Sequence, residues 1–164
     1  MAVNGHGYDR STLLGGKSTG PNPTDRAKSG TKRSILVEGN EMPLAVAVTG
    51  ANRHDMKLAG PTLKGIVIDR PKPTTEHPQN MCMDKGYDFP EVDELVAEWG
   101  YTAHVARRGG GADRSNRRRI PGCRERRWVV EGTNFWMNRF RRLLIRWEEK
   151  RKNYLAMCIS PAPG

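Results

Sequence analysis

The stretch MCMDKGYD, Met81 to Asp88, decides the fold: it is a short apolar run that ends on a carboxylate and is followed by lysine, glycine and tyrosine. An apolar run of this length bounded by turn residues predicts a buried strand. Asp84 then stands at the carboxyl end of that strand, where α/β sheets bind their ligands. The same side chain could instead serve only to cap a turn. Asp84 is therefore the first candidate site residue, with both roles open.

Strand and helix patterns surround this stretch. Two apolar, β-branched runs joined by a turn with Gly and Asn predict a hairpin over residues 34–50. A helix of about ten residues after Asp55 should either break at Gly60 and Pro61 or start later. A helix over Pro90–Trp99 and a short strand from Tyr101 then complete a strand-helix-strand unit with parallel strands. The sequence thus predicts an α/β fold.

We expect one domain with little regular structure at its ends. Residues 1–34 are rich in Gly, Ser, Thr and Pro and predict an irregular segment, whereas residues 35–156 should hold the domain and residues 157–164 a short disordered tail. Residues 107–127 predict a loop rich in glycine and arginine. The 3 cysteines form no CxxC pair, so neither a disulfide framework nor a zinc site is indicated.

The C-terminal part predicts one long helix over Glu125–Tyr154. On a helical wheel Glu131 lines up with Arg127, Asn138 and Arg142, opposite an apolar face. The residues of that apolar face are Val129, Trp136, Phe140, Leu143 and Trp147. Glu131 is a second candidate carboxylate, or else a member of a solvated face that pairs with Arg127.

Positive charge is concentrated in the C-terminal half. The net charge is +10, and between Arg107 and Lys152 sixteen Lys or Arg stand against five Asp or Glu. Such a segment predicts a polyanionic partner, either a nucleic acid or an anionic membrane surface. No apolar run is long enough to span a membrane and no signal-peptide pattern begins the chain, so we expect a cytoplasmic protein.

Several stretches together resemble the catalytic domain of bacterial insertion-sequence transposases. They are GPNPTDRAKSGTKRSILVE, PLAVAVTGANRHD, MCMDKGYDFPEV and RRWVVEGTNFWMNRFRRLLIRWEEKRKNYLA, and the resemblance covers about residues 15–156. It implies a ribonuclease-H-like fold, with a mixed sheet flanked by helices. It also implies DNA transposition by cleavage and strand transfer, with double-stranded DNA of the terminal repeats and the target as partner. A nucleoid-associated bacterial protein without membrane contact, and a homodimer, are further expectations.

The family uses an Asp-Asp-Glu triad that binds two divalent ions, Mg²⁺ or Mn²⁺. Two such ions, roughly 3.5–4 Å apart, activate the attacking oxygen and stabilise the leaving one. Asp84 in DKGYD matches the second member of the triad and Glu131 in RRWVVE matches the third. Asp9 in YDRST has roughly the place of the first, although no apolar strand precedes it, so we expect an incomplete first strand. Asp25 is expected to be structural or a DNA contact, and Asp55 a helix cap.

The resemblance also implies contacts with DNA phosphates. Arg127 matches a basic residue that the family has one turn before Glu131. Gly132 stands where the family usually has arginine, which costs about 1 kcal/mol of helix stability relative to alanine. The chain looks shortened at both ends, so a non-catalytic DNA-binding remnant is the alternative function. The residues expected to contact DNA are Lys85, Arg127, Arg139, Arg142 and Arg146.

Overall fold

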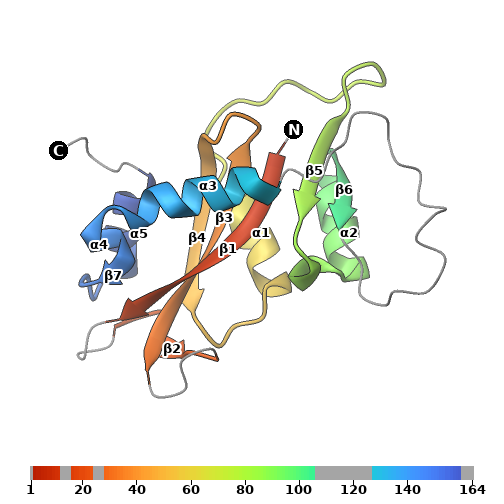
Figure 1. Ribbon diagram of the computed structural model, residues 1–164. Helices are drawn as coiled ribbons and strands as arrows, with labels where there is room; N and C mark the ends of the chain where they lie inside the picture. Colours follow the sequence, from red (N-terminus) through yellow and green to blue (C-terminus); the bar gives the residue numbers. More distant parts are fainter. Residues whose placement is uncertain (1, 12–15, 24–27, 106–126, 160–164) are drawn as a thin grey trace.

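The computed structural model describes residues 2–11, 16–23, 28–105 and 127–159; for residues 2–11 and Arg127 it describes the backbone alone. One mixed sheet is flanked by helices (Figure 1). The strands are β1 (Ala2–Ser11), β2 (Gly20–Pro21), β3 (Ser29–Glu38), β4 (Pro43–Gly50), β5 (Gln79–Met83), β6 (Tyr101–Val105) and β7 (Ile145–Arg146). The helices are α1 (Met56–Lys64), the short 3₁₀ helix η1 (Lys85–Tyr87), α2 (Pro90–Glu98), α3 (Arg127–Asn138), α4 (Arg141–Leu144) and α5 (Arg151–Ile159).

Strand β1 lies in the middle of the sheet. It pairs antiparallel with β3 on one side and parallel with β5 on the other. Beyond β3 lies β4, antiparallel to it, and beyond β5 lies β6, parallel to it. The main order is therefore β4-β3-β1-β5-β6, while the short strands β2 and β7 pair with β3 and β1. One half of the sheet is antiparallel and the other parallel.

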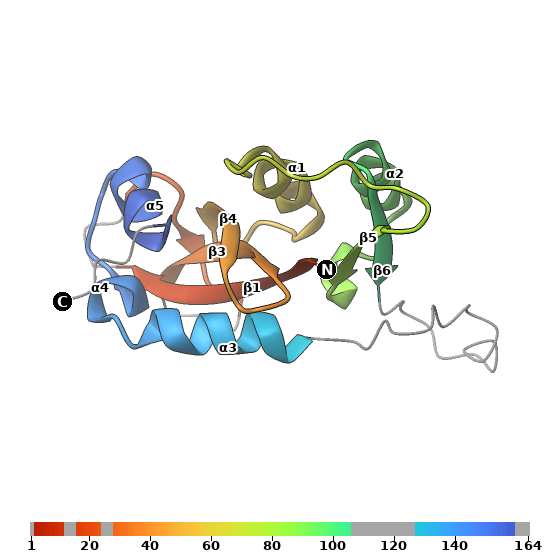
Figure 2. The same cartoon turned by 90° about the horizontal axis from the view of Figure 1, so that it is seen from above.

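Two apolar clusters cover the two faces of this sheet. Because side chains alternate along a strand, Ile35 and Val37 belong to one cluster and Leu36 to the other. The first cluster packs against α3, α4 and α5 and the second against α1 and α2. Figure 2 shows α3 on one side of the sheet and α1 and α2 on the other. Any site between the sheet and α3 is thus separated from the α1 and α2 side.

Most of the central elements are as expected. The hairpin of β3 and β4, the strand β5, the helix α2 and the parallel strand β6 are all confirmed. The break expected at Gly60 and Pro61 is wrong, because α1 runs through both. Proline removes one helical hydrogen bond. Burial of Leu58, Leu63 and Thr62, whose Oγ1 donates to the Leu58 carbonyl at 2.7 Å, holds the helix together.

The first strand is present, and the expectations of an irregular N-terminal segment and an incomplete first strand are wrong for Ala2–Ser11. These residues carry few apolar side chains in a strand pattern, so the sequence did not indicate a strand. Their backbone is instead paired on both sides, with β3 from Ala2 to Arg10 and with β5 from Ala2 to Asn4. Neighbouring strands rather than local propensity thus form this element.

The single long C-terminal helix is also wrong. Phe140 and Ile145 have extended backbones, so the chain forms α3, α4, the short strand β7 and α5. The apolar face differs accordingly: Val129, Thr133 and Met137 are buried, whereas Trp136 is 45% exposed. Helix α5 reaches Ile159, so residues 157–159 are helical and not a tail.

Two further expectations lie outside the described residues: the loop rich in glycine and arginine, and Asp25. Within the described residues, no helix is both long and apolar enough to cross a membrane.

Candidate active site

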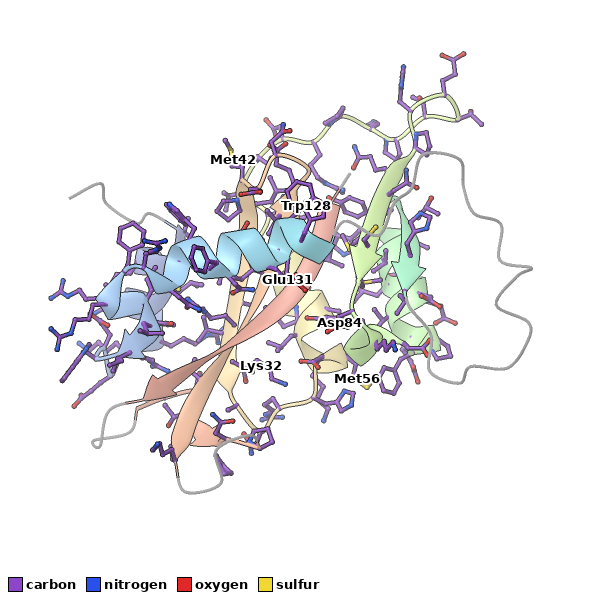
Figure 3. All side chains as sticks on the ribbon, in the orientation of Figure 1. Lys32, Met42, Met56, Asp84, Trp128 and Glu131 are labelled. Carbon is purple, nitrogen blue, oxygen red and sulfur yellow. The ribbon has the colours of Figure 1, made fainter. Side chains whose placement is uncertain are left out.

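The structure places Asp84 and Glu131 on the same face of the sheet. Asp84 directly follows β5 and has an extended backbone, so its side chain continues the face of Cys82. Cys82 packs in one apolar cluster with Val129 and Val130 of α3, and Glu131 is the next residue of that helix. Figure 3 shows Asp84 just beyond the end of β5 and Glu131 on the N-terminal half of α3. The two carboxylates, 47 residues apart in the chain, thus both adjoin the same apolar cluster.

The turn after Asp84 is anchored in the core. Asp84 Oδ1 accepts a hydrogen bond from the Lys85 amide at 2.7 Å, so the expected turn-capping role is confirmed. The Tyr87 ring is fully buried, its hydroxyl lies 2.8 Å from Ser34 Oγ, and the same Ser34 oxygen lies 2.8 Å from Thr62 Oγ1. The Asp84 side chain itself remains partly exposed. A buried tyrosine therefore positions a carboxylate that still reaches solvent.

A buried ion pair supports the same turn from the other side. Lys32 Nζ lies 2.9 Å from Asp55 Oδ1 and also donates to the Arg53 carbonyl at 2.8 Å. Asp55 Oδ2 lies so close to Gly86 that a Cβ there would collide with it. Asp55 occupies the N-cap position of α1 but makes no side-chain capping bond, so its expected role as a helix cap is wrong. Its carboxylate instead forms an ion pair with Lys32, which lies on the buried strand β3.

Glu131 is exposed on α3, and the hairpin turn packs beside it. Thr133 Oγ1 donates to the Glu41 carbonyl at 3.1 Å. A Cβ on Gly132 would lie 3.3 Å from the Glu41 carboxylate atoms. The Arg127 side chain lies outside what the structure describes, so its pairing with Glu131 stays a prediction.

The backbone register does not bring Asp9 to Asp84. Asn4 of β1 pairs with Met83, so continuing the register by one residue puts Gly5 beside Asp84. Asp9 pairs with Thr31 instead, four residues further along β1. At about 3.3 Å per residue this is roughly 13 Å beyond Gly5. Asp9 as a metal ligand stays a prediction, and the register favours a different position.

Three of the expected DNA contacts are accessible. Lys85, Arg139 and Arg142 are exposed, and Arg141 beside them is exposed as well. Arg142 and Lys85 lie on different elements, α4 and η1. Accessible positively charged side chains are therefore found both on the turn after Asp84 and on the segment that follows α3.

Arg146 as a DNA contact is wrong. It is 2% exposed, and its guanidinium donates to the carbonyls of Lys17, Glu148 and Glu149 at 2.8–3.1 Å. It also donates to Thr31 Oγ1 at 3.0 Å. These bonds join two parts of the chain that line a shallow cavity of about 600 Å³ with basic walls. The cavity is lined by Gly16, Lys17, Glu149, Lys150, Arg151 and Lys152. Arg146 therefore holds the two parts of this basic surface together from a buried position.

Sequence reasoning missed the supports of the Asp84 turn. Lys32 and Ser34 lie on a strand that is buried throughout its centre, and each meets a polar partner there. Buried polar groups need partners, so Ser34, a polar residue at the start of the predicted strand, was an available signal. Lys32 stands in the segment expected to be irregular, where burial was not predicted. Of their partners, Tyr87 follows Asp84 by three residues, whereas Asp55 approaches the Asp84 turn only in the fold.

Comparison with known proteins decides the family. The family model described as transposase DDE domain matches residues 3–160. The chain belongs to this family. The DDE domain is also 35% identical over 142 residues to the transposase for insertion sequence element IS402 of Burkholderia cepacia. That alignment covers 83% of this chain and 62% of the relative, so the chain spans about 62% of the relative's length.

A solved structure is similar to this DDE domain as well. It is the piggyBac transposase synaptic complex with hairpin DNA, at a TM-score of 0.44 and 12% identity. The similarity covers 73% of this chain and 26% of that chain.

Proposed function

We propose that this chain is the catalytic domain of an insertion-sequence transposase, which cleaves double-stranded DNA at the ends of its element and joins them to a target. Membership of the DDE family supports the proposal. So does the architecture, because a mixed sheet flanked by helices is what the ribonuclease-H-like fold of these transposases requires.

The convergence of Asp84 and Glu131 carries the proposal. Each lies on a well-supported element, at the end of β5 and on α3, and both reach solvent on the face of the sheet that α3 covers. Exposed cations nearby supply contacts for phosphates, since Lys85 directly follows Asp84. Within this site the two carboxylates are the groups that would act at the scissile phosphodiester.

Cleavage of a phosphodiester by two carboxylates requires a bound metal ion. Two carboxylates beside a phosphodiester repel it, and a divalent ion with oxygen ligands removes the repulsion. The family resemblance implies two Mg²⁺ or Mn²⁺ ions held by three carboxylates. No group of three metal-binding side chains occurs among the side chains that the structure describes. The register of β1 puts Gly5, and not Asp9, beside Asp84, which argues against Asp9 as the third carboxylate of the set.

This mismatch favours a second candidate function. A chain that keeps its basic surface but lacks the third carboxylate would bind DNA without cutting it. Both functions predict DNA affinity that falls with salt, because neutralised phosphates release counterions. They differ only in strand cleavage.

The test is a nicking assay on supercoiled plasmid that carries the genomic flanks of the coding region, with Mg²⁺ or Mn²⁺ present. Under the first function the wild-type chain nicks the plasmid, and Asp84→Asn and Glu131→Gln each abolish nicking. Glu98→Gln, at the exposed end of α2, is the matched control and nicks like the wild type. A wild-type chain that binds the DNA without nicking it supports the second function and excludes the first.

Gly5→Asp tests the reason for the second function. If the chain is inactive because β1 lacks a carboxylate beside Asp84, this substitution raises its affinity for Mn²⁺, measured by calorimetry. Asn4→Asp, one residue earlier on β1, is the positional control, because neighbouring residues of a strand point to opposite faces. A gain with Asn4→Asp and none with Gly5→Asp would contradict the register argument.

A further inference from the structure

We propose that the basic cavity beside α5 is a second contact for duplex DNA, separate from the position of the cleaved phosphodiester. The inference rests on the proposed function, because it names a further surface along which the same DNA would lie. The cavity, called here the distal cavity, is lined by Gly16, Lys17, Glu149, Lys150, Arg151 and Lys152. Four of these six residues carry a positive charge and one carries a negative charge.

Buried contacts fix the walls of the distal cavity. Arg146 donates to the Lys17 carbonyl at 2.8 Å and to the Glu149 carbonyl at 3.1 Å, so it joins the two segments that form the cavity. A Cβ on Gly16 would lie 3.0 Å from the Glu149 carbonyl oxygen, so the absence of a side chain lets these segments pack closely. The backbone of both walls is therefore in place before a ligand binds, which lowers the cost of binding.

The turn that carries Lys17 has a strained backbone. Ser18 has a φ of 69°, in the left-handed region that residues other than glycine rarely adopt. Its carbonyl accepts hydrogen bonds from Arg146 Nη1 at 3.3 Å and from Thr31 Oγ1 at 3.4 Å. Strain of this kind is typical of functional sites, where the surrounding structure maintains it. Here the strained turn holds Lys17 at the wall of the cavity.

The distal cavity lies far from Asp84. Strand β1 connects the two places: its register, continued by one residue, puts Gly5 beside Asp84, whereas Ser11 pairs with Arg146. From Gly5 to Ser11 the strand advances roughly 20 Å, at about 3.3 Å per residue. Figures 1 and 2 show α5 on one side of the molecule and β5 on the other. Because B-DNA rises about 3.4 Å per base pair, this distance corresponds to roughly six base pairs.

The residues around the cavity favour DNA over other anionic partners. Cations in two neighbouring segments fit the regularly spaced phosphates of a duplex, which proteins bind mainly through Lys and Arg. Helices that lie on anionic membranes bury apolar side chains beside their cations, and the residues that line this cavity have none. A second copy of this chain would bring like charges together, which opposes association. A duplex that extends from Asp84 would instead bring its outer phosphates to the cavity.

The experiment measures the affinity for labelled hairpin-closed duplexes of about 5 and about 20 base pairs by fluorescence anisotropy without divalent ions. The cavity variant combines Lys17→Gln, Lys150→Gln and Lys152→Gln. We expect it to bind the long duplex about 10-fold or more weakly, because a second simultaneous contact is lost. The slope of log affinity against log salt should fall by about 2–3, since each phosphate contact contributes about 0.9. The short duplex cannot reach both places, so its affinity should change by less than about 3-fold.

Two further variants sharpen the test. A matched control combines Lys57→Gln, Lys64→Gln and Lys72→Gln, which remove the same charge from exposed positions on α1 and on the loop after it. This control should bind the long duplex within about 2-fold of the wild type, because salt screens distant charges. Glu149→Gln removes the acid from the cavity and should strengthen binding of the long duplex by about 2-fold or more.

Three results overturn the inference. Equal losses in the cavity variant and the matched control would mean that overall charge, and not the cavity, binds DNA. Equal losses on the short and the long duplex would mean that the cavity is not a second contact at a distance. A cavity variant that no longer binds vesicles of anionic phosphatidylglycerol and keeps its affinity for the long duplex would mean that the cavity binds a membrane.

The same data separate the inference from the proposed function. If the wild-type chain binds neither duplex, the proposed function fails together with the inference. If the wild-type chain binds the long duplex and the cavity variant binds it equally well, the inference alone fails.

Discussion

At the residue scale, the turn behind Asp84 depends on the absence of a side chain at Gly86. The Asp55 carboxylate occupies the space where a Cβ would be, and Lys32 holds that carboxylate in place at 2.9 Å. The Lys32 side chain is 5% exposed and the Asp55 side chain 14%, so the pair has little freedom to move aside. Overpacking at such a contact costs typically 1–3 kcal/mol, about the effect of a lost buried hydrogen bond.

Gly86→Ala is therefore expected to destabilise the chain by about 1–3 kcal/mol in urea unfolding. The same change should cost less when Lys32→Met and Asp55→Ala remove the ion pair together, because no carboxylate then meets the new Cβ. Equal costs in the two backgrounds would show that Asp55 is not the contact that restricts Gly86.

Gly132→Ala should instead increase the free energy of unfolding. Alanine is about 1 kcal/mol better than glycine within a helix, and the new Cβ would meet only the end of the exposed Glu41 side chain. We expect a gain of roughly 0.5–1 kcal/mol in urea unfolding. Gly60→Ala in α1, whose nearest contact is Leu95 Cδ2 at an ordinary 3.7 Å, is the reference. A loss at Gly132 with a gain at Gly60 would mean that Glu41 cannot move away.

At the scale of elements, α4 and β7 carry two arginines with different roles. Arg146 is buried among carbonyls from two parts of the chain, whereas Arg142 is exposed. Arg146→Met is expected to lower the free energy of unfolding by about 3 kcal/mol or more, because it leaves buried carbonyls without donors. Arg142→Met should leave stability within about 0.5 kcal/mol and weaken DNA binding. Calorimetric unfolding together with DNA anisotropy separates the two roles, and an exchange of the two phenotypes would contradict the assignment.

Strand β6 introduces a pH dependence through His104. Burial lowers the pKa of His104 from its ordinary value of 6.5, and its Nε2 lies 2.9 Å from Asn80 Oδ1. The unfolded chain then binds a proton at a higher pH than the folded chain does. Stability should be complete above about pH 6.5 and fall as the pH drops toward the lowered folded pKa.

His104→Gln should remove that part of the pH dependence in unfolding experiments between neutral and mildly acidic pH. His77→Gln, at an exposed position in the loop before β5, should leave it unchanged. An unchanged slope in His104→Gln would show that other groups cause the loss.

Elements with a clear local pattern could be predicted from the sequence, and elements shaped by distant partners could not. The apolar run before Asp84 and the period of Val92 and Val96 indicate β5 and α2 correctly. Strand β1 forms because β3 and β5 flank it, and no local pattern shows that. The last helix breaks where Arg146 turns inward to bond with carbonyls near Lys17, a contact across 129 positions of the chain.

At the scale of the whole molecule, Glu131 was predictable as a candidate through its motif, but the face of the sheet on which it lies depends on how α3 packs. The packing of Val129 and Val130 against Cys82 determines the face of the sheet on which α3, and with it Glu131, lies. The first member of the triad could not be placed by motif alone, because the register of β1 determines which of its residues lies beside Asp84. Sequence therefore indicates the chemistry, and strand pairing determines which residues can take part in it.

The central claim is that Asp84 and Glu131 act as one site. The most direct test is a calorimetric titration with Mn²⁺ of the wild-type chain, Asp84→Asn, Glu131→Gln and the double variant. A shared site predicts that each single substitution weakens Mn²⁺ binding by about 10-fold or more and that the double substitution adds little further loss. Mn²⁺ binding that survives both single substitutions, or losses that simply add in the double variant, would contradict the account.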